Sequence, residues 1–153
     1  MRLTGDSSGM VDRILVPFDE SEQARTALEH ALTTHPDAEI VVLNVIDLME
    51  AGYSAPFDGG LPGYWEEWYE QEEETAEDLL ARAQEIADEY GVELDTEVVV
   101  GRPARAINEY ADENDIDQIL IGSHGRTGVS RILLGSVAEA VVRRAHCPVT
   151  VVR

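Results

Sequence analysis

The chain has 153 residues, 44% of them hydrophobic, which is typical of one globular domain. Its 31 acidic residues against 11 basic residues give a formal net charge of −20, which argues against nucleic acid as a partner. The single cysteine, Cys147, excludes an intrachain disulfide, and the lack of any apolar run of about 18 to 20 residues excludes a membrane-spanning helix.

The N-terminal residues are not expected to form a targeting signal. Residues 1–11 (MRLTGDSSGMV) contain no apolar run of the kind found in a signal peptide. We therefore expect a flexible N-terminal extension over residues 1–11, one domain over residues 12–153, and a cytoplasmic location.

The first half of the domain alternates between strand and helix patterns. Residues 12–18 (DRILVPF) and 39–46 (EIVVLNVI) hold the short continuous apolar runs that are typical of buried strands. Between them, small and apolar residues recur at helical spacing from residue 21 to residue 34, with Ser21 as the expected N-cap. Residues 47–64 contain several glycines and prolines and predict a long loop.

The second half continues the alternation. Helical spacing returns at Trp65 and runs to Tyr90, after which Gly91 is expected to cap the C-terminus of the helix. The apolar face of this helix includes Trp65, Trp68 and Tyr69, which we expect in the core. The remaining predicted elements are strands over residues 92–100, 118–121 and 149–152, and helices over residues 104–114 and 136–145.

This order of elements predicts an α/β fold. Strands that read as continuous apolar runs and are separated by helices indicate a parallel sheet covered on both faces. We predict a single-domain, open five-stranded parallel sheet with strand order 3-2-1-4-5. Ligands of such sheets bind outside the carboxyl ends of the strands, where the segments after the first and fourth strands would face each other.

The segment after the fourth strand carries the most informative motif, GSHGRTGVSRILLGS over residues 122–136. Gly122 and Gly125 would let the backbone approach a ligand closely. Gly135 and Ser136 open a helix, whose unpaired amides and dipole attract phosphate. Two alternatives need no ligand: Ser136 and Glu139 fit a capping box, and Gly122 also fits a simple strand end.

The motif Gly-x2-Gly-x9-Gly-Ser resembles the signature of the ATP-binding branch of the universal stress protein family. ILVPFDES (14–21) is similar to the first strand and turn of that family, VVLNVID (41–47) to its second strand, and CPVTVV (147–152) to its last. The similarity covers residues 12–153. It implies a Rossmann-like sheet of the adenine nucleotide alpha hydrolase kind, with ATP as the ligand and Mg²⁺ arriving with the triphosphate.

The resemblance also implies site residues. At the nucleoside end, Asp19 beside Pro17 would face the adenosine, Val45 would touch the adenine, and Ile121 and Gly122 would line the ribose. The phosphates would be held by Gly125, Gly135, Ser136 and Val137. Arg126 and Arg131 would approach the phosphates or remain solvated.

The resemblance implies an ATP-binding stress-response or signalling protein. We expect at most slow ATP hydrolysis, because no catalytic set of side chains is evident in the sequence. The alternative is a dimeric interaction module of the same fold that binds no nucleotide. The apolar last strand, Val149–Val152, would form a sheet edge, and the resemblance implies a homodimer through it.

Two further hypotheses concern the surface. An acidic chain without lysine resembles proteins of extreme halophiles, because molar salt screens the repulsion between its charges; an ordinary acidic protein is the alternative. The glycine-rich residues 51–64 follow a strand end on the ligand side and are interpreted either as a lid over the nucleotide or as a tolerated insertion.

Overall fold

The computed structural model describes residues 12–47, 64–123 and 134–153. The predicted N-terminal extension and nearly all of the predicted lid lie outside the described residues. The same holds for Gly125, Arg126 and Arg131 of the glycine motif.

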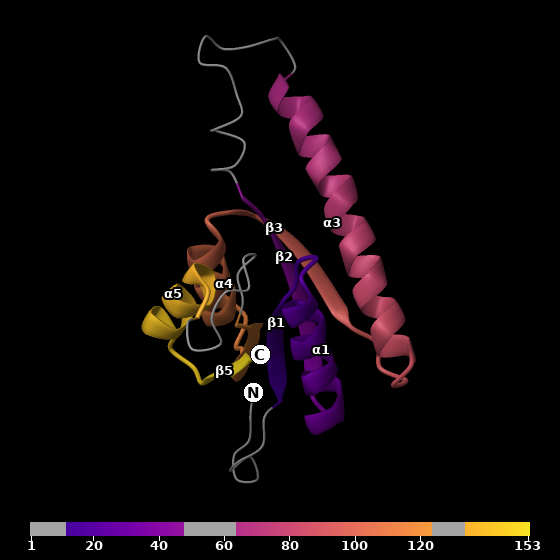
Figure 1. Cartoon of the computed structure of the whole chain (residues 1–153), viewed down its shortest axis with the longest axis vertical. Coiled ribbons are helices and arrows are strands. Elements are labelled where there is room, and N and C mark those ends of the chain that lie inside the picture. Colours follow the sequence, from indigo (N-terminus) through magenta and orange to yellow (C-terminus); the bar gives the residue numbers. More distant parts are fainter. Residues whose placement is uncertain (1–11, 48–63, 124–133) are drawn as a thin grey trace.

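The described residues alternate between strands and helices as predicted (Figure 1). The strands are β1 (Arg13–Pro17), β2 (Glu39–Asp47), β3 (Asp95–Gly101), β4 (Gln118–Gly122) and β5 (Val149–Val152). The helices are α1 (Glu22–Thr34), α3 (Tyr64–Asp88), α4 (Pro103–Glu113) and α5 (Ser136–Arg144). All neighbouring strands pair in parallel in the order β3-β2-β1-β4-β5, which confirms the predicted topology.

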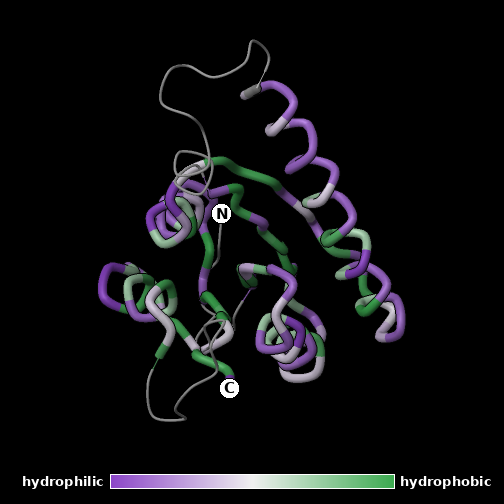
Figure 2. The backbone as a smooth tube through the Cα atoms, turned by 45° about the horizontal axis from the view of Figure 1, so that its top comes forward, coloured by the Kyte–Doolittle hydropathy of each residue, from purple (hydrophilic) through white to green (hydrophobic). Residues whose placement is uncertain are grey.

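Helices cover both faces of the sheet, and each face has its own apolar core. Ile14, Val42 and Leu120 belong to the core under α1 and α3. Leu15 and Ile119 belong to the core under α4 and α5. Because alternate residues of one strand point to opposite faces, both kinds must be apolar, which explains the uninterrupted apolar runs. Figure 2 shows the resulting contrast between largely hydrophobic strands and helices in which hydrophilic and hydrophobic residues are mixed.

The helix ends follow the predicted capping signals. Ser21 is the N-cap of α1, and its hydroxyl accepts a hydrogen bond of 3.1 Å from the Ala24 amide. After α3, Gly91 has a φ of 72°, and the Val92 amide donates to the Ala87 carbonyl at 3.1 Å. This is a Schellman arrangement with glycine at its left-handed position.

The third strand begins later than predicted. Residues 92–94 are tied to α3 rather than to β2, because the Gln84 side chain donates to the Val92 carbonyl and accepts from the Leu94 amide, both at 3.0 Å. A side chain from the preceding helix therefore takes up backbone groups that would otherwise pair in the sheet.

The prediction that the aromatic residues at the start of α3 lie in the core is wrong. Trp65 is 49% exposed and Tyr69 is 38% exposed. Trp65 and Trp68 contact each other edge to face, with ring centroids 6.3 Å apart. In Figure 1 the start of α3 projects past the end of the sheet, so this part of its apolar face has no sheet beneath it. Ala76 is the first buried residue of α3, and the α3 residues of the core cluster begin at Leu79.

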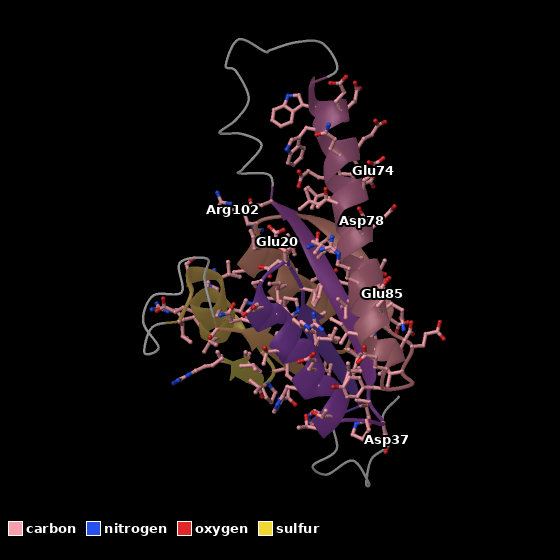
Figure 3. All side chains as sticks on the ribbon, turned by 45° about the vertical axis from the view of Figure 1, so that its right-hand side comes forward. Glu20, Asp37, Glu74, Asp78, Glu85 and Arg102 are labelled. Atoms are coloured by element: carbon pink, nitrogen blue, oxygen red, sulfur yellow. The ribbon has the colours of Figure 1, made fainter. Side chains whose placement is uncertain are left out.

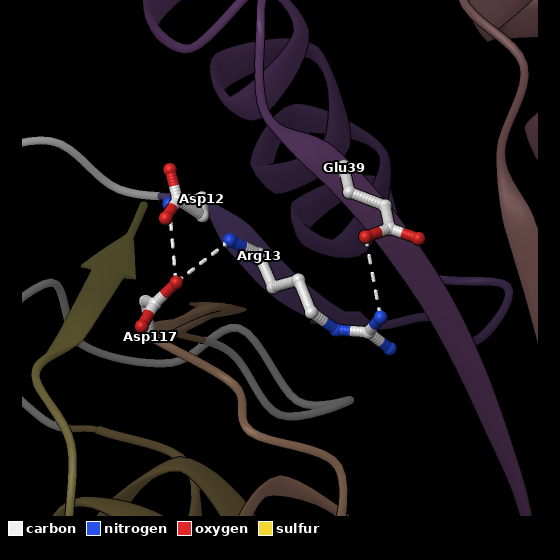
Figure 4. A network of polar contacts seen from close by, with 4 residues as sticks. All are labelled: Asp12, Arg13, Glu39 and Asp117. Atoms are coloured by element: carbon white, nitrogen blue, oxygen red, sulfur yellow. Dashed lines mark hydrogen bonds and ion pairs between the residues drawn. The ribbon is translucent and has the colours of Figure 1, made fainter. Parts of the chain in front are cut away.

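Polar contacts close the amino ends of the central strands, opposite the expected site (Figure 4). The Asp117 carboxylate accepts from the amides of Asp12 and Arg13, at 3.1 and 2.9 Å. The Arg13 guanidinium pairs with Glu39 at 3.2 Å. These contacts join the starts of β4, β1 and β2.

Candidate functional site

A pocket of about 810 Å³ lies at the carboxyl ends of β1, β2 and β4. Its walls come from the segment joining β1 to α1, the end of β2, the middle of α3, and the starts of α4 and α5. This is where ligands bind in open parallel sheets. The predicted site residues that line it are Pro17, Asp19, Val45, Ile121, Gly122, Ser136 and Val137. Gly135 directly precedes the α5 wall and does not itself line the pocket.

The end of β1 is held in place by Asn44, a residue that the sequence analysis missed. Asn44 is 8% exposed, and its side-chain amide donates to the Phe18 carbonyl at 2.8 Å. The Phe18 amide in turn donates to the Leu43 carbonyl at 2.9 Å. These bonds fix the backbone next to Asp19. The available signal was a lone asparagine within the apolar run of β2, since buried polar groups are usually hydrogen-bonded.

Asp19 is exposed and lines the pocket. One of its carboxylate oxygens, Oδ1, accepts from the Ser21 amide at 2.9 Å, which orients the side chain from its own turn. Within the part of the chain that the structure describes, the second oxygen has no partner. Asp19 is therefore positioned to accept a hydrogen bond from a hydroxyl or amino group of a ligand.

Gly122 is required by packing inside the protein. A Cβ atom at this position would lie 2.7 Å from the carbonyl carbon and the Cβ of Gln23, and 2.9 Å from the Gln23 oxygen. The first turn of α1 thus approaches the end of β4 too closely for any side chain. Glycine at this position permits the close packing of α1 against β4, and this reason for the glycine does not depend on a ligand.

The start of α5 does not form the capping box that was one alternative. Gly135 is the N-cap and Ser136 is the first helical residue, so no side chain caps the helix. Glu139 instead pairs with Arg143 at 3.0 Å. The Gly135 amide donates to the Ser123 carbonyl at 2.7 Å. Among the described residues, none accepts a hydrogen bond from the amides of Ser136 and Val137. These amides are donors available at the pocket wall.

The side chains of the pocket wall are acidic. The described lining residues include no arginine or histidine. Their charged members are Asp19, Glu20, Glu22, Asp47 and Glu72. The only positive electrostatic contribution from the described lining is therefore the N-terminal end of a helix, chiefly that of α5.

The described residues offer little other chemistry. Among them, no group of three or more His, Cys, Asp or Glu side chains is placed to hold a metal ion. Burial, with added repulsion from Asp112 and Asp117, raises the pKa of the Cys147 thiol, so the thiol stays protonated at neutral pH. In the same described ranges, no helix combines the length and hydropathy needed to cross a membrane.

Comparison with known proteins gives consistent results. The model of the universal stress protein family matches residues 10–153. Universal stress protein MJ0531 of Methanocaldococcus jannaschii is 38% identical over 152 residues, which cover 97% of this chain and 85% of that protein.

Solved structures share the fold. The structure of protein MJ0577, from the same organism, superposes with a TM-score of 0.79 at 32% identity and covers 94% of this chain and 96% of its own. A universal stress protein in complex with cAMP has a TM-score of 0.66 at 22% identity, covering 95% and 98% of the two chains. A family protein from Arabidopsis thaliana with AMP bound has a TM-score of 0.64 at 17% identity, covering 92% and 90%.

Proposed function

The chain belongs to the universal stress protein family, and we propose that it binds ATP in the pocket at the carboxyl ends of β1, β2 and β4. The observation that carries this proposal is the convergence of residues far apart in sequence. Pro17, Val45, Ile121 and Ser136, from three strands and a helix, line one pocket. Family members with cAMP or AMP bound are further support for an adenine nucleotide.

The proposed roles follow the walls of the pocket. Asp19 accepts from the ribose or the base, Val45 contacts the adenine, and Ile121 and Gly122 line the ribose. The amides of Ser136 and Val137, at the start of α5, hold the phosphates together with Gly135 and the undescribed Gly125 and Arg126. Mg²⁺ accompanies the triphosphate and keeps most of its water ligands.

In this proposal the protein is a stress-response or signalling switch that is read by its nucleotide occupancy. Hydrolysis of ATP is slow at most. The second candidate, a dimeric interaction module without a nucleotide, is less well supported because it gives no reason for uncapped amides at the start of α5. The acidic, lysine-free composition supports the proposal that this protein works in a salt-rich cytoplasm.

We expect purified protein to release adenine nucleotide when it is denatured, detected by absorbance and chromatography. Gly135→Val should bind ATP at least about tenfold more weakly, because a branched side chain beside the free amides occupies phosphate space. Ser136→Ala is the matched control: it removes the hydroxyl, keeps the amides, and should lose less than about fivefold. If Gly135→Val is folded by circular dichroism and binds ATP normally, the proposed phosphate site is wrong.

We also propose a homodimer through β5. Among the described strands, β5 pairs only with β4. The amides of Ile119 and Ser123 donate to the carbonyls of Pro148 and Val152. Because strand residues alternate, the backbone groups of Val151 point to the open edge. An open apolar edge favours pairing with a second copy.

Val151→Pro should convert the dimer to a monomer, because proline removes an edge N–H without removing a bond to β4. Val151→Ala keeps that N–H and should remain dimeric. Analytical ultracentrifugation at several protein concentrations distinguishes the two. Identical sedimentation of wild-type protein and Val151→Pro would contradict dimerisation through β5.

A further inference from the structure

The described walls of the proposed nucleotide pocket carry the same charge sign as its ligand. Asp19, Glu20 and Glu22 come from the segment between β1 and α1, Asp47 from the end of β2, and Glu72 from α3. No basic side chain from the described residues lines the pocket. An adenine nucleotide carries about one negative charge on each bridging phosphate and up to about two on the last. The protein itself has a formal net charge of −20.

The carboxylates are distributed unevenly over the pocket. In the sheet order, β1 lies between β2 and β4. The β2 side carries Asp47 and Glu72, and the central segment carries Asp19, Glu20 and Glu22. The β4 side presents Ile121, Gly122 and the start of α5, which have no carboxylate in the pocket. A ligand with a neutral end and an anionic end is therefore oriented with its phosphates toward α5.

Salt changes the strength of this repulsion over the dimensions of the pocket. The Debye length is about 8 Å at 0.15 M ionic strength and about 3 Å at 1 M. At 0.15 M ionic strength, carboxylates across the pocket repel every phosphate of the ligand. At 1 M ionic strength, only carboxylates in direct contact with a phosphate repel it. Uncharged adenosine is unaffected in either case.

Resting on the proposed function, we propose that the acidic pocket wall makes nucleotide choice depend on salt. At low salt the pocket prefers adenine ligands with few phosphates, and at molar KCl it accepts ATP. The affinity for ATP then rises with ionic strength, which is the reverse of the usual weakening of phosphate binding by salt. Occupancy by ATP thereby reports the ionic strength around the protein.

The test is isothermal titration calorimetry of the whole chain with ATP, AMP and adenosine, in EDTA, at about 0.15 M and about 1 M KCl. ATP should bind at least about tenfold more tightly at the higher salt, AMP about threefold, and adenosine equally within about twofold. Adenosine is the control for folding, because it reports an intact pocket without carrying charge.

Two double variants separate the pocket from the charge of the whole molecule. Glu20→Gln with Glu72→Gln removes two charges from the pocket wall. Glu74→Gln with Glu85→Gln removes two exposed charges from α3 that do not line the pocket. Figure 3 shows Glu74 and Glu85 along α3, apart from Glu20. The pocket variant should reduce the salt effect on ATP at least about threefold, and the α3 variant should leave it unchanged.

The outcomes are distinct. An affinity for ATP that is equal or weaker at high salt overturns the proposal, as does loss of adenosine binding together with ATP at low salt. The proposal is also overturned if both double variants reduce the salt effect on ATP affinity equally, because the net charge of the whole protein would then cause that effect. Failure of all three ligands to bind at either salt concentration refutes the proposed function itself.

Discussion

Gly122→Ala is expected to destabilise the folded chain by about 1–3 kcal/mol, the usual cost of forcing extra volume into a packed interior. The added methyl would lie 2.7 Å from the carbonyl carbon of Gln23, which belongs to a backbone that cannot simply rotate away. The start of α1 is held by the Ser21 cap and by Ala24 and Leu28 in the core. The strain must therefore shift the helix or the end of β4.

The same variant should also weaken ATP binding, because Gly122 and Gln23 both line the pocket. Urea unfolding in molar KCl measures the stability, and calorimetry measures the affinity. Gly91→Ala is the matched control. It has open space around its Cβ but a φ of 72°, so it should cost about 1 kcal/mol and leave the affinity unchanged. Wild-type stability of Gly122→Ala would show that the close approach of α1 and β4 is not required.

Lowering KCl from about 1 M to about 0.15 M is expected to reduce the free energy of unfolding by several kcal/mol, on the order of 3 to 5. The formal net charge of −20 repels itself in the compact state more than in the unfolded chain. The ion pairs within helices, such as Arg25 with Glu29 and Arg105 with Glu109, are exposed. Each contributes about 0.3–0.5 kcal/mol and cannot offset the repulsion.

The measurement is urea unfolding across a KCl series, since urea adds no charge. Sucrose at matched osmolality is the control, because it favours the compact state without screening charge. Equal stability at both salt concentrations would remove the basis for a salt-adapted protein. An equal gain in sucrose would show that screening is not the cause.

The two salt effects predicted for this protein can be measured separately. Unfolding reports the charge of the entire surface, whereas the ratio of ATP to adenosine affinity reports the charge of the pocket wall. If the protein is stable at low salt and still binds adenosine more tightly than ATP there, the pocket charge affects binding although the surface charge does not limit stability. This separation matters because only the second measurement tests the proposed role of the pocket wall.

The amino-acid sequence determined the elements and their order. The apolar runs of β1, β2 and β4 predicted buried parallel strands, Ser21 predicted the start of α1, and Gly91 predicted the end of α3. These features are local: a strand, a cap or a left-handed turn leaves its signal within a few residues of where it occurs. The predicted convergence of the first and fourth strand ends followed from the strand order alone.

The tertiary structure decided what faces each residue. Periodicity placed Trp65 on an apolar face, but the sheet ends before reaching it. Ser136 fitted a capping box, but the chain enters α5 one residue earlier, at Gly135. Gly122 is explained by the backbone of α1, and the acidic wall arises where separate segments meet. The physical reason is that a side-chain pattern records whether a position is buried. The residues that contact this position belong to elements distant in sequence, and only the folded chain fixes where those elements lie.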